Sequence, residues 1–116
     1  MTRLDQIRKA ILTHAPELSS GLDTLDTHWL GAAEPMPESE YLVQVLYPFM
    51  KEHRSDPTAV PLVERILEDC LLTNDALIRY AVDDLLDVFA AHGDSSTFQK
   101  VIDRFALNDP ELNPNA

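Results

Sequence analysis

Apolar residues recur every three or four positions along most of the chain, which is the spacing of amphipathic helices. This pattern predicts helices from Thr2 to His14, from Pro16 to Leu30, from Ala59 to Leu72 and from Asp75 to His92. A last helix is expected to start at Asp94 or Ser95, after a stop at Gly93. Its inward residues would be Phe98, Val101, Ile102 and Phe105.

The two helices between Ala59 and His92 carry the longest apolar stripes, and the chain turns between them at Thr73 and Asn74. The first stripe comprises Val63, Ile66, Leu67, Cys70 and Leu71. The second comprises Leu77, Ile78, Ala81, Val82, Leu85, Leu86, Phe89 and Ala90. Because the second stripe covers about half of the helix circumference, this helix is expected to contact two neighbours.

The stretch EYLVQVLYPFMKEH, residues 40–53, is apolar on nearly all sides and predicts a buried helix. Val and Tyr also favour strands, but the sequence offers no second strand with which this one could pair. Pro48 removes the hydrogen bond to the Gln44 carbonyl, so we expect a kink or a break. The sequence leaves open whether the segment is one kinked helix or two.

Short links between the predicted helices indicate one all-α domain over residues 1–107, followed by a loose tail at 108–116. The expected architecture is a compact bundle of five to six helices. A short HEAT-like stack of helix pairs is the alternative. The clearest loop is GAAEPMPESE, residues 31–40, in which two prolines prevent regular hydrogen bonding.

The charge is strongly negative, with 20 Asp and Glu against 9 Lys and Arg and a net charge of −11. Such a field repels nucleic acids and anionic membranes and attracts basic proteins. The alternative interpretation is that the acidity serves only solubility.

A single cysteine and the absence of a signal peptide or an apolar run of membrane-spanning length predict a cytoplasmic protein.

No group of residues predicts catalysis, a cofactor or a metal. His92, Asp94 and Ser95 have the residue types of a hydrolytic triad, but such close neighbours cannot adopt its geometry. Cys70 belongs to an apolar stripe and is expected to be buried. The pairs Glu64/Glu68 and Asp83/Asp87 lack the Glu-x-x-His spacing of helical di-metal sites.

The strongest functional feature is an acidic helix face with an aromatic ring. Tyr80, Asp83, Asp84 and Asp87 are expected opposite the apolar residues Leu77, Val82 and Leu85. Tyrosine anchors protein contacts, and carboxylates attract Lys and Arg. The predicted partner-binding residues are these four together with Glu64, Glu68, Glu34 and Glu38. The alternative is an ordinary solvated face, with Tyr80 packed beneath another helix.

The order of segments from Glu40 to Phe89 resembles small bacterial helical proteins of the immunity type. The resemblance is one of layout: EYLVQVLYPFMKEH as a buried helix, a turn with proline, then two helices with acidic outer residues. Immunity proteins are encoded beside secreted antibacterial toxins and neutralise them by binding. The resemblance therefore implies a cytoplasmic, non-enzymatic inhibitor of a basic toxin domain. We expect it to act by occlusion, with the acidic faces covering a positively charged active-site cleft of the toxin.

Two alternatives belong to other functional classes. The chain could be a HEAT-like adaptor or the subunit of a homo-oligomer, binding through an apolar surface. An enzyme would require titratable groups that converge in a cleft, for which the sequence gives no sign.

Overall fold

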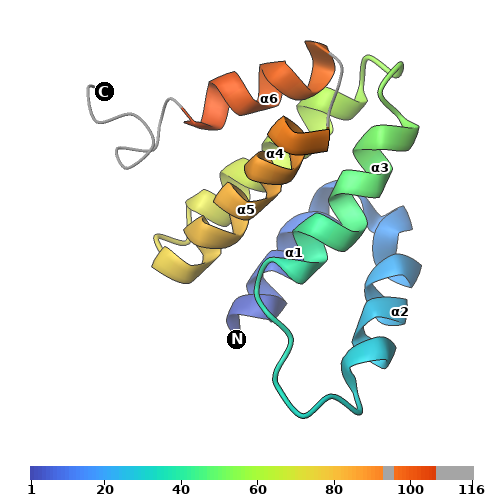
Figure 1. Ribbon diagram of the computed structural model, residues 1–116, viewed down its shortest axis with the longest axis vertical. Coiled ribbons are helices and arrows are strands. Elements are labelled where there is room, and N and C mark those ends of the chain that lie inside the picture. Colours follow the sequence, from blue (N-terminus) through green and yellow to red (C-terminus); the bar gives the residue numbers. More distant parts are fainter. Residues whose placement is uncertain (93–95, 107–116) are drawn as a thin grey trace.

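The computed structural model describes residues 1–92 and 96–106, and these ranges form helices and no strand (Figure 1). The main helices are α1 (Arg3–His14), α2 (Ser19–Trp29), α3 (Tyr47–Glu52), α4 (Ala59–Leu71), α5 (Ala76–His92) and α6 (Ser96–Ala106). A 3₁₀ turn, η1 (Pro16–Leu18), precedes α2, and a π-helical turn, η2 (Leu42–Leu46), precedes α3. The predicted all-α fold is confirmed.

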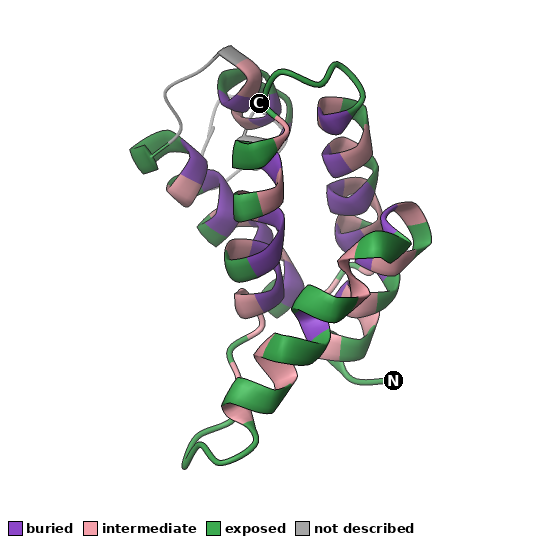
Figure 2. Cartoon of the chain, turned by 90° about the vertical axis from the view of Figure 1, so that its right-hand side faces the viewer, coloured by how far each residue is buried: buried purple, intermediate pink, exposed green. Residues whose placement is uncertain are grey.

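The helices close into a bundle around α4 and α5. α1 packs most extensively on α4, and α5 lies against α4, α6 and η2. α1 also reaches α5. In a stack of helix pairs each pair contacts only adjacent pairs, so the contact between α1 and α5 indicates a bundle. Figure 2 shows the buried positions of these helices turned toward one another, whereas α2 is exposed along most of its length.

The predicted stripes of α4 and α5 form the core, with two corrections on α5. Ile78, Ala81, Val82, Leu85, Leu86 and Phe89 are buried. Leu77 and Ala90, which we predicted to face inward, are exposed. A helix residue is rotated by about 100° from its neighbour, so with Ile78 and Phe89 at the centre of the packed face these two lie outside it.

Residues 40–52 form one continuous helical run, so the segment around Pro48 is one helix and not two. Within it the Tyr47 N–H bonds to the Leu42 carbonyl, a five-residue step that widens the turn just before the proline. Pro48 has no N–H, and its ring would collide with the carbonyl four residues back in a regular α-helix. The π turn provides the room, as π-bulges do inside α-helices.

Side-chain caps fix the first and the fifth helix. Thr2 and Asp5 form a capping box on α1, with Thr2 N–H to Asp5 at 3.2 Å and Asp5 N–H to Thr2 at 3.1 Å. At the start of α5, Asp75 accepts hydrogen bonds from the backbone of Leu77 (2.9 Å) and Ile78 (3.3 Å).

Asp56 does not cap α4 directly, because that helix begins only at Ala59. The Asp56 carboxylate instead accepts from the Thr58 backbone at 2.9 Å within the preceding turn. The expected stop at Gly93, the start at Asp94 or Ser95 and the tail at 108–116 lie outside the described residues.

Candidate protein-binding surface

The eight predicted binding residues lie in three places, not on one surface. Tyr80, Asp83, Asp84 and Asp87 belong to α5, Glu64 and Glu68 to α4, and Glu34 and Glu38 to the loop between α2 and residue 40. Figure 1 shows this loop at the far end of α2, well away from α5. Glu34 is exposed and Glu38 is half-buried. The loop is therefore separate from the helical acidic residues.

Among the described residues, six acidic side chains form ion pairs with cations on other parts of the bundle. Each of several helix contacts carries an ion pair: Arg3–Asp75 (2.8 Å), Arg8–Asp23 (2.5 Å), Arg8–Asp26 (2.9 Å), His14–Asp69 (2.7 Å) and Arg104–Glu64 (2.7 Å). The guanidinium of Arg3 is the main reason why the pKa of Asp75 is lowered from its ordinary value, with the backbone N–H groups of α5 adding to the effect. These carboxylates serve the fold and are engaged within the chain.

Glu64 and Glu68 belong to this structural group. Arg104 of α6 contacts both carboxylates, and the Glu64 side chain is only 17% exposed. The two glutamates repel each other at a four-residue spacing, and the shared guanidinium offsets that repulsion while it fixes α6 on α4. Our prediction that they form an outward acidic face omitted this cation, which lies 36 residues or more further along the chain.

One side of α5 carries exposed side chains of two kinds. We call Leu77, Tyr80, Asp84 and Asp87 the α5 stripe; all four are exposed and follow one another at steps of three and four residues. Leu77 is 41% and Tyr80 48% exposed, so Tyr80 is not packed beneath another helix. Asp83 is half-buried, has a partner within the chain and lies beside the stripe.

The two carboxylates of the α5 stripe carry uncompensated charge. Across residues 1–92 and 96–106, Asp84 and Asp87 form no ion pair. Residues 93–95 and 107–116 contain no Lys, Arg or His that could supply one. Beside Tyr80 the turn between α4 and α5 leaves a hollow of about 380 Å³, which Asp75 and Arg79 also line. The stripe thus combines an aromatic ring, an apolar side chain and two available charges.

Cys70 and clusters of acidic or histidine side chains are the candidates for other chemistry among the described residues. Burial raises the pKa of the Cys70 thiol to about 12, so the sulfur stays protonated and poorly nucleophilic at neutral pH. No three His, Cys, Asp or Glu side chains of residues 1–92 and 96–106 gather as a metal site would require. In the same part of the chain, every helix is too short or too polar to cross a membrane.

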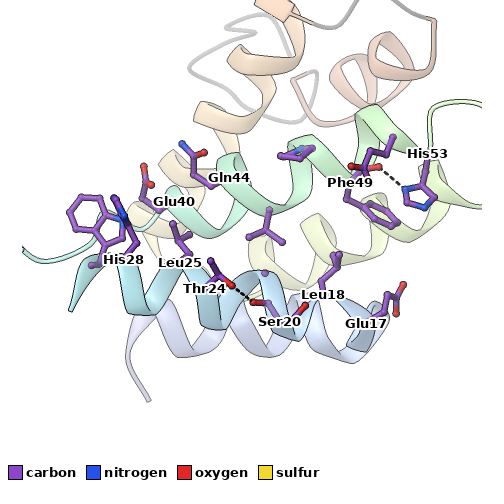
Figure 3. Close-up of a pocket in the computed structure, with 15 residues that line it drawn as sticks. Glu17, Leu18, Ser20, Thr24, Leu25, His28, Glu40, Gln44, Phe49 and His53 are labelled. Atoms are coloured by element: carbon purple, nitrogen blue, oxygen red, sulfur yellow. Dashed lines mark hydrogen bonds between the residues drawn. The ribbon is translucent and has the colours of Figure 1, made fainter. Parts of the chain in front are cut away.

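The sequence did not predict a groove of about 820 Å³ between α2 and the helix of residues 40–52 (Figure 3). Leu18, Leu22, Leu25 and Trp29 keep helical spacing along this part of the chain. Only Leu22 is fully buried, and the other three are half-buried. The composition of α2 gave a sign of this groove. Gly21 and many Ser, Thr and Asp residues leave too few apolar side chains to fill the space between α2 and the helix of residues 40–52.

Comparison with known proteins gives no relative from which a function could be transferred. The chain significantly matches no protein-family model, no curated protein and no solved structure.

Proposed function

We propose that the protein is a non-enzymatic binding module that captures a basic protein through the α5 stripe. The observation that carries this proposal is the exposure of Tyr80 and Leu77 next to two carboxylates, Asp84 and Asp87, that form no ion pair among the described residues. Six other carboxylates of the described residues are engaged in ion pairs, among them Asp75 and Glu64. Charges left free beside an aromatic ring suit an external partner.

The stripe offers the two components that protein interfaces use. Tyrosine gives a large, rigid contact area and is enriched among the residues that dominate binding energy. Carboxylates around it attract Lys and Arg and suppress acidic partners. The net charge of −11 extends this attraction over longer distances and speeds encounter with a cationic surface.

The specific role we propose is that of an immunity protein, acting in the cytoplasm against a toxin domain with a basic active-site cleft. The resemblance of residues 40–89 to such proteins motivates this role. Inhibition would occur by occlusion: α5 covers the cleft, and the acidic side chains take the place of an anionic substrate. The protein itself would perform no chemistry.

A structural adaptor or oligomer subunit is the second candidate, and one observation favours it. Leu72, 78% exposed at the end of α4, and Leu77, 41% exposed on α5, lie on either side of the same turn. Exposed apolar side chains of this kind support docking without charge. The two candidates differ in how they respond to salt.

The test is the ionic-strength dependence of association with a partner captured from the native cell on the tagged protein. Between about 50 mM and 500 mM salt, the association rate constant should fall by about tenfold or more, because screening removes the long-range attraction between acidic and basic surfaces. Stopped-flow or surface plasmon resonance measures it. An association rate that is insensitive to salt would contradict capture by charge and favour the adaptor.

A further inference from the structure

The groove between α2 and residues 40–52 is long and open at the surface. The two helices run antiparallel, so that Glu17 lies near His53 at one end and His28 near Glu40 at the other (Figure 3). From residue 17 to residue 28 the groove extends for about 17 Å, or about three helical turns, at 1.5 Å per residue. Its volume is about 820 Å³.

The floor of the groove is apolar and incompletely covered. The residues that form it come from both helices: Leu18, Leu25, Trp29, Val45 and Phe49. Trp29 also holds a buried indole nitrogen with no hydrogen-bond acceptor among the described residues. Atoms of the chain itself cover this nitrogen, so the part of the Trp29 ring that lines the groove is apolar.

Polar contacts on the opposite side of α2 hold this helix in place and leave the groove open. Arg8 of α1 holds Asp23 and Asp26 of α2, and the Tyr41 hydroxyl donates to Asp26 from the neighbouring helix. These contacts fix α2 to the bundle through its polar side. The apolar residues Leu18 and Leu25 are consequently left facing the groove and are only half-buried.

The rim of the groove is acidic at both ends. Glu17 and Glu52 lie at one end and Glu40 at the other. In the part of the chain that the structure describes, none of these three carboxylates forms an ion pair, and no Lys or Arg lines the groove. An apolar floor between free carboxylates is complementary to an apolar segment flanked by positive charges.

We infer that the groove binds an amphipathic helix of a partner protein, with one apolar face and Lys or Arg near both of its ends. A helix fits because the groove lies between two helices, where a third packs by inserting its side-chain ridges. This site is independent of the α5 stripe and goes beyond the proposed function, since it shares no residue with that surface.

The chain itself cannot supply the occupant. A second copy carries the same charge of −11, and its most basic helix, α1, already uses Arg3 and Arg8 in ion pairs and buries Ile7 and Ile11. Residues 107–116 contain no cation. The positive charges must therefore come from another protein.

The probe is a synthetic amphipathic peptide of Leu and Lys, about 14 residues or four helical turns long, without aromatic residues. Trp29 is the single tryptophan of the chain and lines the groove, so its fluorescence reports occupancy directly. We expect a saturable change in Trp29 emission with the Leu/Lys peptide and none with the corresponding Leu/Glu peptide. No response to the Leu/Lys peptide would overturn the inference.

Two pairs of charge reversals with the same change in net charge separate the groove from general attraction. Glu17→Lys with Glu52→Lys should weaken peptide binding by about tenfold or more, because both carboxylates lie on the rim. Asp84→Lys with Asp87→Lys, on the α5 stripe, should change peptide binding by less than about twofold, because salt screens charges that lie outside the groove. Gln44→Arg places bulk and positive charge on an exposed groove residue and should weaken it as well.

Equal weakening by both pairs would overturn the groove as the site and leave only attraction to net charge. A Trp29 response that depends on protein concentration without peptide would overturn it in favour of a second copy. The proposed function of the α5 stripe is tested separately. Substitutions on the stripe would affect capture of the native basic partner and would leave the peptide titration unchanged.

Discussion

Replacing Tyr80 by alanine together with Asp84 by lysine is expected to weaken capture of the basic partner by about 3 kcal/mol, or about 150-fold in dissociation constant. The alanine removes the aromatic anchor, which is half exposed and available for contact. The lysine replaces attraction by repulsion at a position with no compensating cation in the described chain. Isothermal titration calorimetry with the purified partner measures the effect.

A matched control for this double variant is available on the loop and the end of α2. Leu30→Ala with Glu34→Lys also removes one exposed apolar side chain and reverses one exposed charge. It changes the net charge equally but lies far from α5. We expect it to bind within about threefold of the native protein, since screened charges at that distance contribute little. Similar losses in both variants would mean that only net charge matters.

Phe89→Ala should destabilise the fold by about 3–5 kcal/mol, the usual cost of removing a large aromatic side chain from a packed core. Phe89 is fully buried. The centroid of its ring lies 5.0 Å from the ring centroid of Phe98 on α6 and 6.1 Å from that of Tyr47 on α3. It therefore joins three helices, and the cavity left by alanine would face all of them. Urea unfolding followed by circular dichroism measures the change in the free energy of unfolding.

The control for this prediction is on the same helix. Tyr80→Ala removes an aromatic ring that is nearly half exposed and should cost less than about 1 kcal/mol, because little apolar area is lost from the core. The contrast also shows that the binding variant keeps its fold. Equal destabilisation by Phe89→Ala and Tyr80→Ala would contradict our assignment of the inner and outer sides of α5.

The positions of the helices and most of the core could be predicted because they depend on local periodicity. Ile78, Val82, Leu85 and Phe89 follow the helical repeat, and the neighbours they require need not be known in advance. The same repeat places Tyr80, Asp84 and Asp87 on one exposed side. It misplaced Leu77, because the width of a helix face that becomes buried depends on the neighbours as well as on the spacing.

Contacts between distant residues could not be predicted. Nothing near Glu64 or Glu68 indicates that Arg104 will neutralise them, since the pairing depends on how α6 crosses α4. The same holds for Arg8, which reaches Asp23 and Asp26 of the next helix. Which carboxylates remain free for a partner is therefore decided by tertiary packing.

The groove escaped prediction for a related reason. The apolar residues of α2 follow the helical repeat, which indicates an amphipathic helix but not whether its apolar side will be fully covered. Coverage depends on the helix of residues 40–52, whose course is set by the π turn before Pro48, and on the polar contacts that hold α2 from its other side. Neither feature can be recognised from periodicity.

Carboxylate labelling in the complex tests most directly whether the α5 stripe meets a cationic protein. Carbodiimide coupling of glycine ethyl ester, read by mass spectrometry, compares each acidic residue in the free protein and in the complex with its captured partner. We predict that Asp84 and Asp87 lose most of their labelling on binding, whereas exposed Glu34 keeps it. Unchanged labelling of Asp84 and Asp87 in the bound protein would contradict binding through the α5 stripe.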